Sequence, residues 1–97
     1  MEFLALIEVR SPPDRDPDEL ARTMAAETAR VKELTEAGTL KRLWRIPGRW
    51  ANWTLWEAPD ATALHQGLTS LPMYPWLEIT VHPLAVHPSD PERPEVP

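Results

Sequence analysis

The sequence predicts an α+β domain in which strands and helices follow one another in the order βαββαβ. Three observations support this prediction. An apolar, strand-forming segment opens the chain, two tryptophan-rich segments flank a Pro-Gly turn, and a helix-favouring stretch lies on each side of that pair. The order is that of the ferredoxin-like fold, a four-stranded antiparallel sheet with both helices on one face.

The first strand and the first helix have clear local signals. Residues 2–10 are mostly apolar on both faces, which indicates a largely buried strand, and Ser11-Pro12-Pro13-Asp14 ends it. Asp16 is a suitable N-cap before Pro17, because proline is tolerated in the first helical turn. We therefore expect a helix from Pro17 to about residue 37, where Gly38 supplies a C-terminal stop.

The rest of the chain predicts a hairpin, a shorter helix and a last strand. Residues 39–46 and 50–57 read as two strands joined at Pro47-Gly48-Arg49, where glycine permits a tight connection. A helix is predicted over 59–70, and a strand of alternating character over 76–86. Residues 1–86 would then form the domain, followed by a proline-rich arm over 87–97.

Composition limits the function classes. A chain of 97 residues is enough for one domain, and the absence of cysteine excludes disulfides and zinc-thiolate or iron-sulfur sites. The net charge of −5 disfavours nucleic acid and anionic membranes as partners. No segment approaches the roughly 20 apolar residues of a transmembrane helix, and no signal peptide is evident, so we expect a cytoplasmic protein.

Self-association is expected from the predicted layers. Two helices on one face leave the other face of the sheet without a cover, and in so small a chain a second copy is the available cover. We therefore predict sheet-to-sheet packing of a dimeric α+β barrel type.

Glu27 is the residue that interrupts the apolar pattern of the first helix. The stripe that points toward the sheet contains Leu20, Met24, Val31 and Leu34, and Glu27 lies within it. Burial would raise the pKa of this carboxyl and make it a useful proton acceptor and donor near neutral pH. The alternatives are a position at the margin of the stripe, a side chain that reaches solvent, or a structural ion pair with an arginine.

The predicted hairpin offers donors that could face Glu27. If Gly48 and Arg49 are the central residues of a two-residue turn, Arg45 and Asn52 become cross-strand neighbours on one face. A guanidinium beside an amide can hold a carboxylate or stabilise a dienolate oxygen. In the alternative interpretation Arg45 is a solvated strand residue and Asn52 a cap near the turn, and a bulge or longer turn would separate the two.

Aromatic and polar neighbours of this pair suggest a small-ligand pocket. The residues expected to surround the ligand are Trp50, Thr54 and Trp56. The tryptophans could equally be core or subunit contacts. The three histidines show no metal-ligand spacing, and we predict no metal site.

Several motifs resemble the muconolactone delta-isomerase family. They are the run Leu43-Trp44-Arg45-Ile46-Pro47-Gly48-Arg49-Trp50-Ala51-Asn52-Trp53, the element Leu71-Pro72-Met73-Tyr74-Pro75, Ala63-Leu64-His65, Pro12-Pro13-Asp14, Glu27, Glu33-Leu34, Gly38 and His87-Pro88-Ser89. The resemblance covers nearly the whole chain without gaps.

The resemblance implies an enzyme that needs no metal and no cofactor and converts muconolactone to the 3-oxoadipate enol-lactone in aromatic-compound catabolism, the β-ketoadipate pathway. Glu27 would carry the proton, while Arg45 and Asn52 would bind the carboxylate or the dienolate. The resemblance also implies a homodimer that assembles into a decamer.

Three positions depart from the family pattern and keep other functions open. These are Thr28, Arg49 and Trp50, and the last two could contact a different substrate. The alternatives are a cyclase or monooxygenase-like enzyme acting on an aromatic polyketide, and a non-catalytic module that binds a small ligand.

Overall fold

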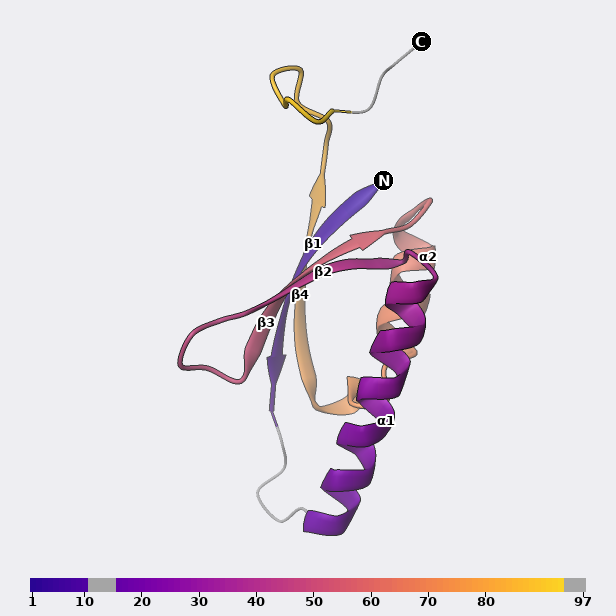
Figure 1. Ribbon diagram of the computed structural model, residues 1–97, viewed down its shortest axis with the longest axis vertical. Helices are drawn as coiled ribbons and strands as arrows, with labels where there is room; N and C mark the ends of the chain where they lie inside the picture. The colour runs from indigo at the N-terminus through magenta and orange to yellow at the C-terminus, as the bar shows by residue number, and fades with distance from the viewer. Residues whose placement is uncertain (11–15, 94–97) are drawn as a thin grey trace.

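The chain follows the predicted order in the computed structural model, which describes residues 1–10 and 16–93 (Figure 1). The elements are β1 (Glu2–Val9), α1 (Pro17–Glu36), β2 (Leu40–Arg45), β3 (Ala51–Glu57), α2 (Ala61–Thr69), the short 3₁₀ helix η1 (Tyr74–Trp76) and β4 (Leu77–Leu84). The predicted break at 11–14 and the last four residues of the predicted arm lie outside the described residues.

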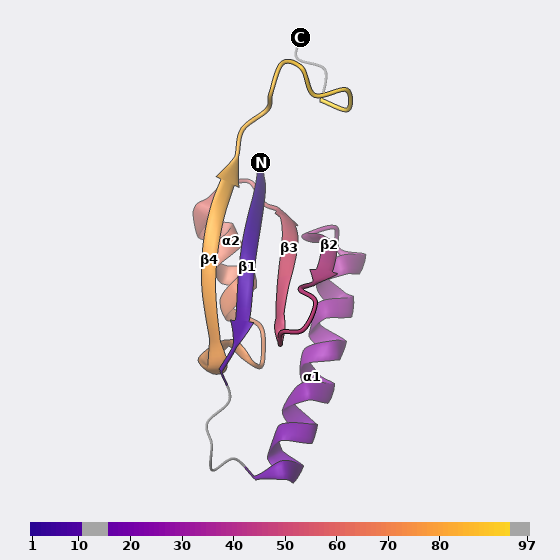
Figure 2. The same ribbon diagram turned by 90° about the vertical axis from the view of Figure 1, so that its left-hand side faces the viewer.

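The four strands form one antiparallel sheet in the order β2-β3-β1-β4. Both helices lie on the same face, and Figure 2 shows the sheet in front with α1 and α2 behind it. The predicted ferredoxin-like α+β fold is thus confirmed. Beyond β4 the chain continues away from the sheet (Figure 2). Within residues 1–10 and 16–93 no helix is both long enough and apolar enough to cross a membrane.

Helix ends follow the predicted local chemistry. The carboxylate of Asp16 accepts a hydrogen bond of 3.1 Å from the backbone N–H of Asp18, and Pro17 occupies the first helical turn. After α1, Gly38 adopts a φ of 79°, which is costly for residues with a Cβ. Asp60 caps α2 in the same way, accepting from the N–H of Ala63 at 2.8 Å. These caps fix where each helix meets the sheet.

The hairpin has the predicted register but a different turn. Ile46 accepts a hydrogen bond of 3.2 Å from the N–H of Arg49, so Pro47 and Gly48 are the central residues. The prediction that Gly48 and Arg49 form the centre was wrong. Proline favours the first central position, and Gly48, with a φ of 77°, supplies the positive φ that a type II turn requires at the second. Arg45 nevertheless pairs with Asn52.

A β-bulge in β2 decides which of its side chains face the helices. Leu40 pairs with Trp56 and Arg42 with Leu55, so Lys41 is an extra residue without a cross-strand partner. Alternation alone would place Leu40 and Arg45 on opposite faces, because an odd number of positions separates them. The bulge corrects this by one residue, and both side chains face the helices.

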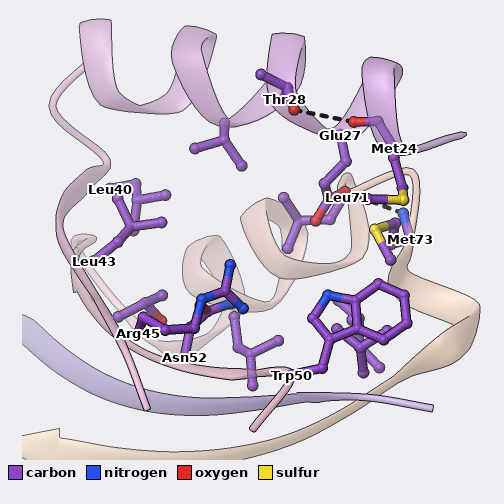
Figure 3. Close-up of a pocket in the computed structure, with 15 residues that line it drawn as sticks. Met24, Glu27, Thr28, Leu40, Leu43, Arg45, Trp50, Asn52, Leu71 and Met73 are labelled. Carbon is purple, nitrogen blue, oxygen red and sulfur yellow. Dashed lines mark hydrogen bonds between the residues drawn. The ribbon is translucent and has the colours of Figure 1, made fainter. Parts of the chain in front are cut away.

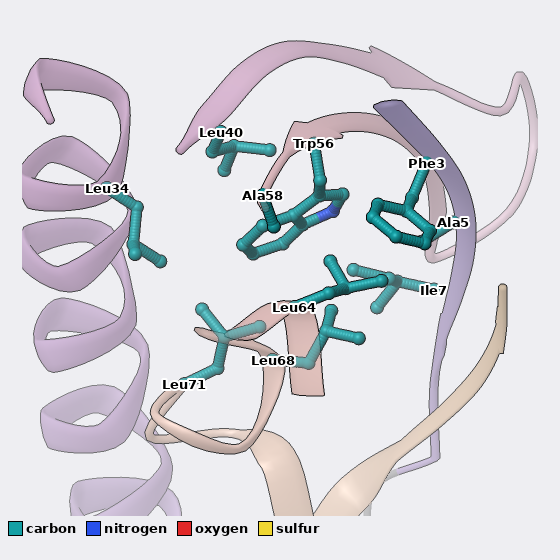
Figure 4. Packing of buried hydrophobic residues seen from close by; sticks show 10 residues of the cluster. All are labelled: Phe3, Ala5, Ile7, Leu34, Leu40, Trp56, Ala58, Leu64, Leu68 and Leu71. Carbon is teal, nitrogen blue, oxygen red and sulfur yellow. The ribbon is translucent and has the colours of Figure 1, made fainter. Parts of the chain in front are cut away.

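The hydrophobic core lies between the sheet and the helices (Figure 4). Trp56 is its largest member and is fully buried. The sheet, both helices and the connections next to α2 contribute the remaining members of the cluster, which are Phe3, Ala5, Ile7, Leu34, Leu40, Ala58, Leu64, Leu68 and Leu71. Burial of these side chains provides the main driving force for folding. It also gives the neighbouring cavity a rigid wall.

Candidate active site

A cavity of about 160 Å³ lies beside the core, between α1, the connection from α2 to β4, and the sheet (Figure 3). Its walls are mostly apolar, with Val31 on α1, Leu40 and Leu43 on β2, and Leu71 on the connection. The only ionisable groups in the described lining are Glu27 and Arg45. The cavity therefore combines a small apolar space with one acid and one permanent cation.

Glu27 projects from α1 into this cavity (Figure 3). Its Oε1 atom accepts a hydrogen bond of 3.1 Å from the backbone N–H of Met73. Burial raises the pKa of the Glu27 carboxyl above its usual value, because the charged form loses hydration, and the hydrogen bond from Met73 opposes part of this effect. A carboxyl whose pKa is raised toward neutrality can accept a proton and return it.

Arg45 and Asn52 lie on the sheet side of the cavity, across from Glu27 (Figure 3). The two residues are cross-strand partners on β2 and β3, as the sequence predicted. In the described part of the chain, neither side chain has a hydrogen-bond or ion-pair partner. Their N–H groups are therefore available to a ligand in the cavity, and a guanidinium beside an amide suits an anionic oxygen.

Trp50 and Thr54 also line the cavity, as predicted. Trp50 forms one edge and is 42 % exposed, so its ring can cover a ligand. The buried Thr54 hydroxyl has its own partners, since it donates to the carbonyl of Ala5 at 3.1 Å and accepts from Nε1 of Trp56 at 2.7 Å. Its proton is already committed, so Thr54 shapes the wall and does not donate to a ligand.

Two residues expected around the ligand lie outside the cavity. Trp56 is 0 % exposed and belongs to the core, because its place two positions beyond Thr54 brings it under α2. Arg49 lies at the turn, and its guanidinium points away from the cavity because the carboxylate of Glu8 on β1 attracts it at 3.7 Å. The structure does not bring either side chain to the site.

Three further lining residues are not among the site residues predicted from the sequence. Met24 and Thr28 lie on α1 near Glu27 (Figure 3), and the Thr28 hydroxyl donates to the Met24 carbonyl at 3.1 Å. The N–H of Met73 is a backbone donor, which side-chain patterns cannot predict. The one hint was the Leu-Pro-x-x-Pro element, which indicates a restrained backbone there.

The fold and the cavity together define the class of protein. It is a small ferredoxin-like α+β protein with a candidate site between its sheet and its helices. The family model described as muconolactone delta-isomerase matches residues 1–90. The chain belongs to this family of isomerases, so it is an enzyme.

Relatives agree over most of the chain. Muconolactone Delta-isomerase of Pseudomonas aeruginosa is 38 % identical over 89 residues, which are 92 % of this chain and 93 % of that protein. The enzyme of the same name from Rhodococcus opacus is 35 % identical over 88 residues, covering 91 % and 95 %. A crystal structure of muconolactone isomerase superposes with a TM-score of 0.90 at 34 % identity, covering 99 % of this chain and all of that one.

Proposed function

We propose that this enzyme converts muconolactone, or a closely related unsaturated lactone with an acidic side chain, to the corresponding enol-lactone, with Glu27 as the proton carrier. The observation that carries the proposal is the position of Glu27, half-buried in a small cavity and opposite two unpaired donors. The names of the relatives support muconolactone as the substrate.

The chemistry needs one base that acts twice. The Glu27 carboxylate takes the proton from the ring carbon that bears the side chain, and the electrons of that C–H bond pass into the conjugated lactone as a dienolate. The protonated carboxyl then returns a proton to the carbon next to the carbonyl. No electrons are gained or lost overall, so two proton transfers by the same group complete the reaction.

Arg45 and Asn52 would stabilise the negative charge during this reaction. The dienolate oxygen or the carboxylate of the side chain would accept from the guanidinium and the amide. Two donors fixed on neighbouring strands need little reorganisation when the charge develops. The apolar walls strengthen these interactions by excluding water.

The size of the cavity favours a lactone over an aromatic polyketide. A protein cavity of about 150 Å³ is enough to hold one benzene molecule, and this cavity measures about 160 Å³. One small ring with a short side chain is of this size, whereas a polycyclic aromatic is considerably larger. This comparison favours the isomerase over the cyclase or monooxygenase-like alternative.

The decisive experiment compares wild type with Glu27→Gln by following the ultraviolet change of muconolactone. We expect kcat to fall by about 10² or more, since this is the typical contribution of a general acid–base group. Glu36→Gln is the matched control, because Glu36 is an exposed acid on the same helix. Equal rates for Glu27→Gln and wild type on every lactone tested would refute the assignment. Tight binding without turnover would instead support the non-catalytic module.

We further propose that a second copy covers the open face of the sheet, giving a homodimer that assembles into a decamer. On this face Trp44 pairs with Trp53, and Trp53 pairs with Leu6, so apolar side chains cross three strands. Trp44 is 41 % exposed, which is unusual for so large an apolar side chain. Light scattering should show an oligomer for wild type and a smaller species for Trp53→Glu. A monomeric wild type at every concentration would contradict the proposal.

A further inference from the structure

The connection between α2 and β4 presents a backbone N–H to the cavity. Leu71 accepts a hydrogen bond of 2.9 Å from the N–H of Tyr74, and Met73 accepts one of 2.8 Å from Trp76. These bonds close two successive turns of the connection. The N–H of Met73 points out of these turns and donates to Oε1 of Glu27, on the other helix, at 3.1 Å.

This donor is held firmly in place. Pro72 and Pro75 flank it, and each proline ring restricts φ. The side chains of Leu71 and Met73 are 4 % and 5 % exposed, so the connection is anchored in the core on both sides of Pro72. A donor fixed in this way can set the orientation of the carboxylate that it binds.

We propose that the backbone N–H of Met73 is a positioning group that keeps Oε1 of Glu27 as an acceptor and leaves Oε2 to take up and return the substrate proton. The inference rests on the proposed role of Glu27. It goes further, because it assigns different tasks to the two oxygens of the carboxylate and gives the Leu-Pro-x-x-Pro connection a part in catalysis.

The chemistry of the two protonation states supports this division. An N–H group needs an acceptor in both states, and Oε1 can accept as part of a carboxylate or as the carbonyl oxygen of the acid. The substrate C–H bond breaks as the Oε2–H bond forms, and the reverse transfer restores the carboxylate. The hydrogen bond to Met73 persists throughout, so the carboxyl does not rotate between the two steps.

The test removes the hydrogen bond from the backbone N–H of Met73 to Glu27 without changing any side chain. Met73 is replaced by its α-hydroxy acid, which exchanges the N–H for an ester oxygen and keeps the side chain. The matched control is the same exchange at Tyr74, whose N–H donates to Leu71 within the turn and not to Glu27. Circular dichroism and thermal melts establish that both esters fold.

The first readout is the pKa of the Glu27 carboxyl, followed by ¹³C NMR and assigned with Glu27→Gln. The only other ionisable side chain in the described cavity lining is Arg45, which has no carboxyl carbon to confuse the ¹³C signal. The ester at 73 should raise the Glu27 pKa further, because the N–H favours the charged form, and the ester at 74 should leave it unchanged. No change at 73, or equal changes in both esters, would overturn the proposal.

Kinetics provide the second readout. We expect the ester at 73 to lower kcat about tenfold with little effect on KM, and to move the acid limb of the pH–rate profile to higher pH. An unchanged kcat and profile would overturn the proposal. If the wild type turned over no lactone, the proposed function would fail, while the NMR titration would still decide whether the N–H controls the carboxyl.

Discussion

Thr54→Val tests whether the wall of the cavity depends on a buried pair of hydrogen bonds. Thr54 is 2 % exposed, and its hydroxyl links the carbonyl of Ala5 on β1 to the indole of Trp56 on β3. Valine has nearly the same shape as threonine but can neither donate nor accept. The substitution therefore removes both bonds and changes the volume of the side chain little, so the cost reports the lost bonds.

The expected cost follows from these two bonds. Each buried hydrogen bond contributes about 1 kcal/mol net, and leaving the indole N–H without an acceptor adds a desolvation penalty. Trp56 is 0 % exposed, so no water can replace the hydroxyl without rearrangement. We expect Thr54→Val to lower the free energy of unfolding by about 2 to 3 kcal/mol. For a domain of this size that lowers Tm by about 10 °C or more.

Urea denaturation at a fixed protein concentration measures this cost, because an oligomer's apparent stability changes with concentration. Thr54→Ser is the control that keeps the hydroxyl and loses one methyl group, which should cost about 1 kcal/mol. A double-mutant cycle with Trp56→Phe isolates the bond to the indole. Phenylalanine removes the donor, so Thr54→Val should cost less by about 1 kcal/mol or more in that background.

Two results would refute the reasoning. The first is a Thr54→Val protein as stable as wild type, and the second is a cost that stays the same when Trp56 is phenylalanine. The first would mean that neither bond stabilises the fold, and the second would mean that the hydroxyl does not satisfy the indole.

Three further predictions concern the site and the hairpin. Burial raises the pKa of Glu27 in the folded state above its unfolded value, so ionisation destabilises the fold as the pH rises between the two pKa values. Glu27→Gln should therefore have a higher Tm than wild type at neutral pH and no such advantage in acid. A Tm difference that does not change with pH would contradict this. Gly48→Ala should cost about 1 to 2 kcal/mol in urea denaturation because φ is 77°, whereas an unchanged midpoint would show that the turn can relax. Arg45→Gln should raise KM for an acidic lactone about tenfold or more, and Arg49→Gln, whose side chain faces Glu8, should not.

Much of the fold was predictable because its signals are local. Asp16 and Pro17 mark the start of α1, and the positive φ of Gly38 and Gly48 marks two places where the chain must turn. Each depends only on residues a few positions away. The order of elements then limits the topology to very few arrangements, and the family resemblance points to the same one.

The face that each residue of β2 presents was predicted only in part. The pairing of Arg45 with Asn52 follows from the short connection between the strands, although the turn itself differs. The bulge at Lys41 could not be predicted, because no residue near it in the sequence requires an extra, unpaired position in the strand. Only the strand pairing shows it, and because of it Leu40 and Arg45 both lie on the face toward the helices.

The sequence by itself determined the elements, their order and the presence of an acid within an apolar helix face, since these depend on periodicity and nearest neighbours. Only the tertiary structure decided that Met73 donates to Glu27, that the Thr54 hydroxyl accepts from the Trp56 indole, and that Arg49 lies outside the cavity. The physical reason is that packing sets these contacts and residue spacing does not. Met73 and Glu27, like Arg49 and Glu8, lie far apart in the chain, and the bond between Thr54 and Trp56 forms only because the core holds the indole over its neighbour on the same strand.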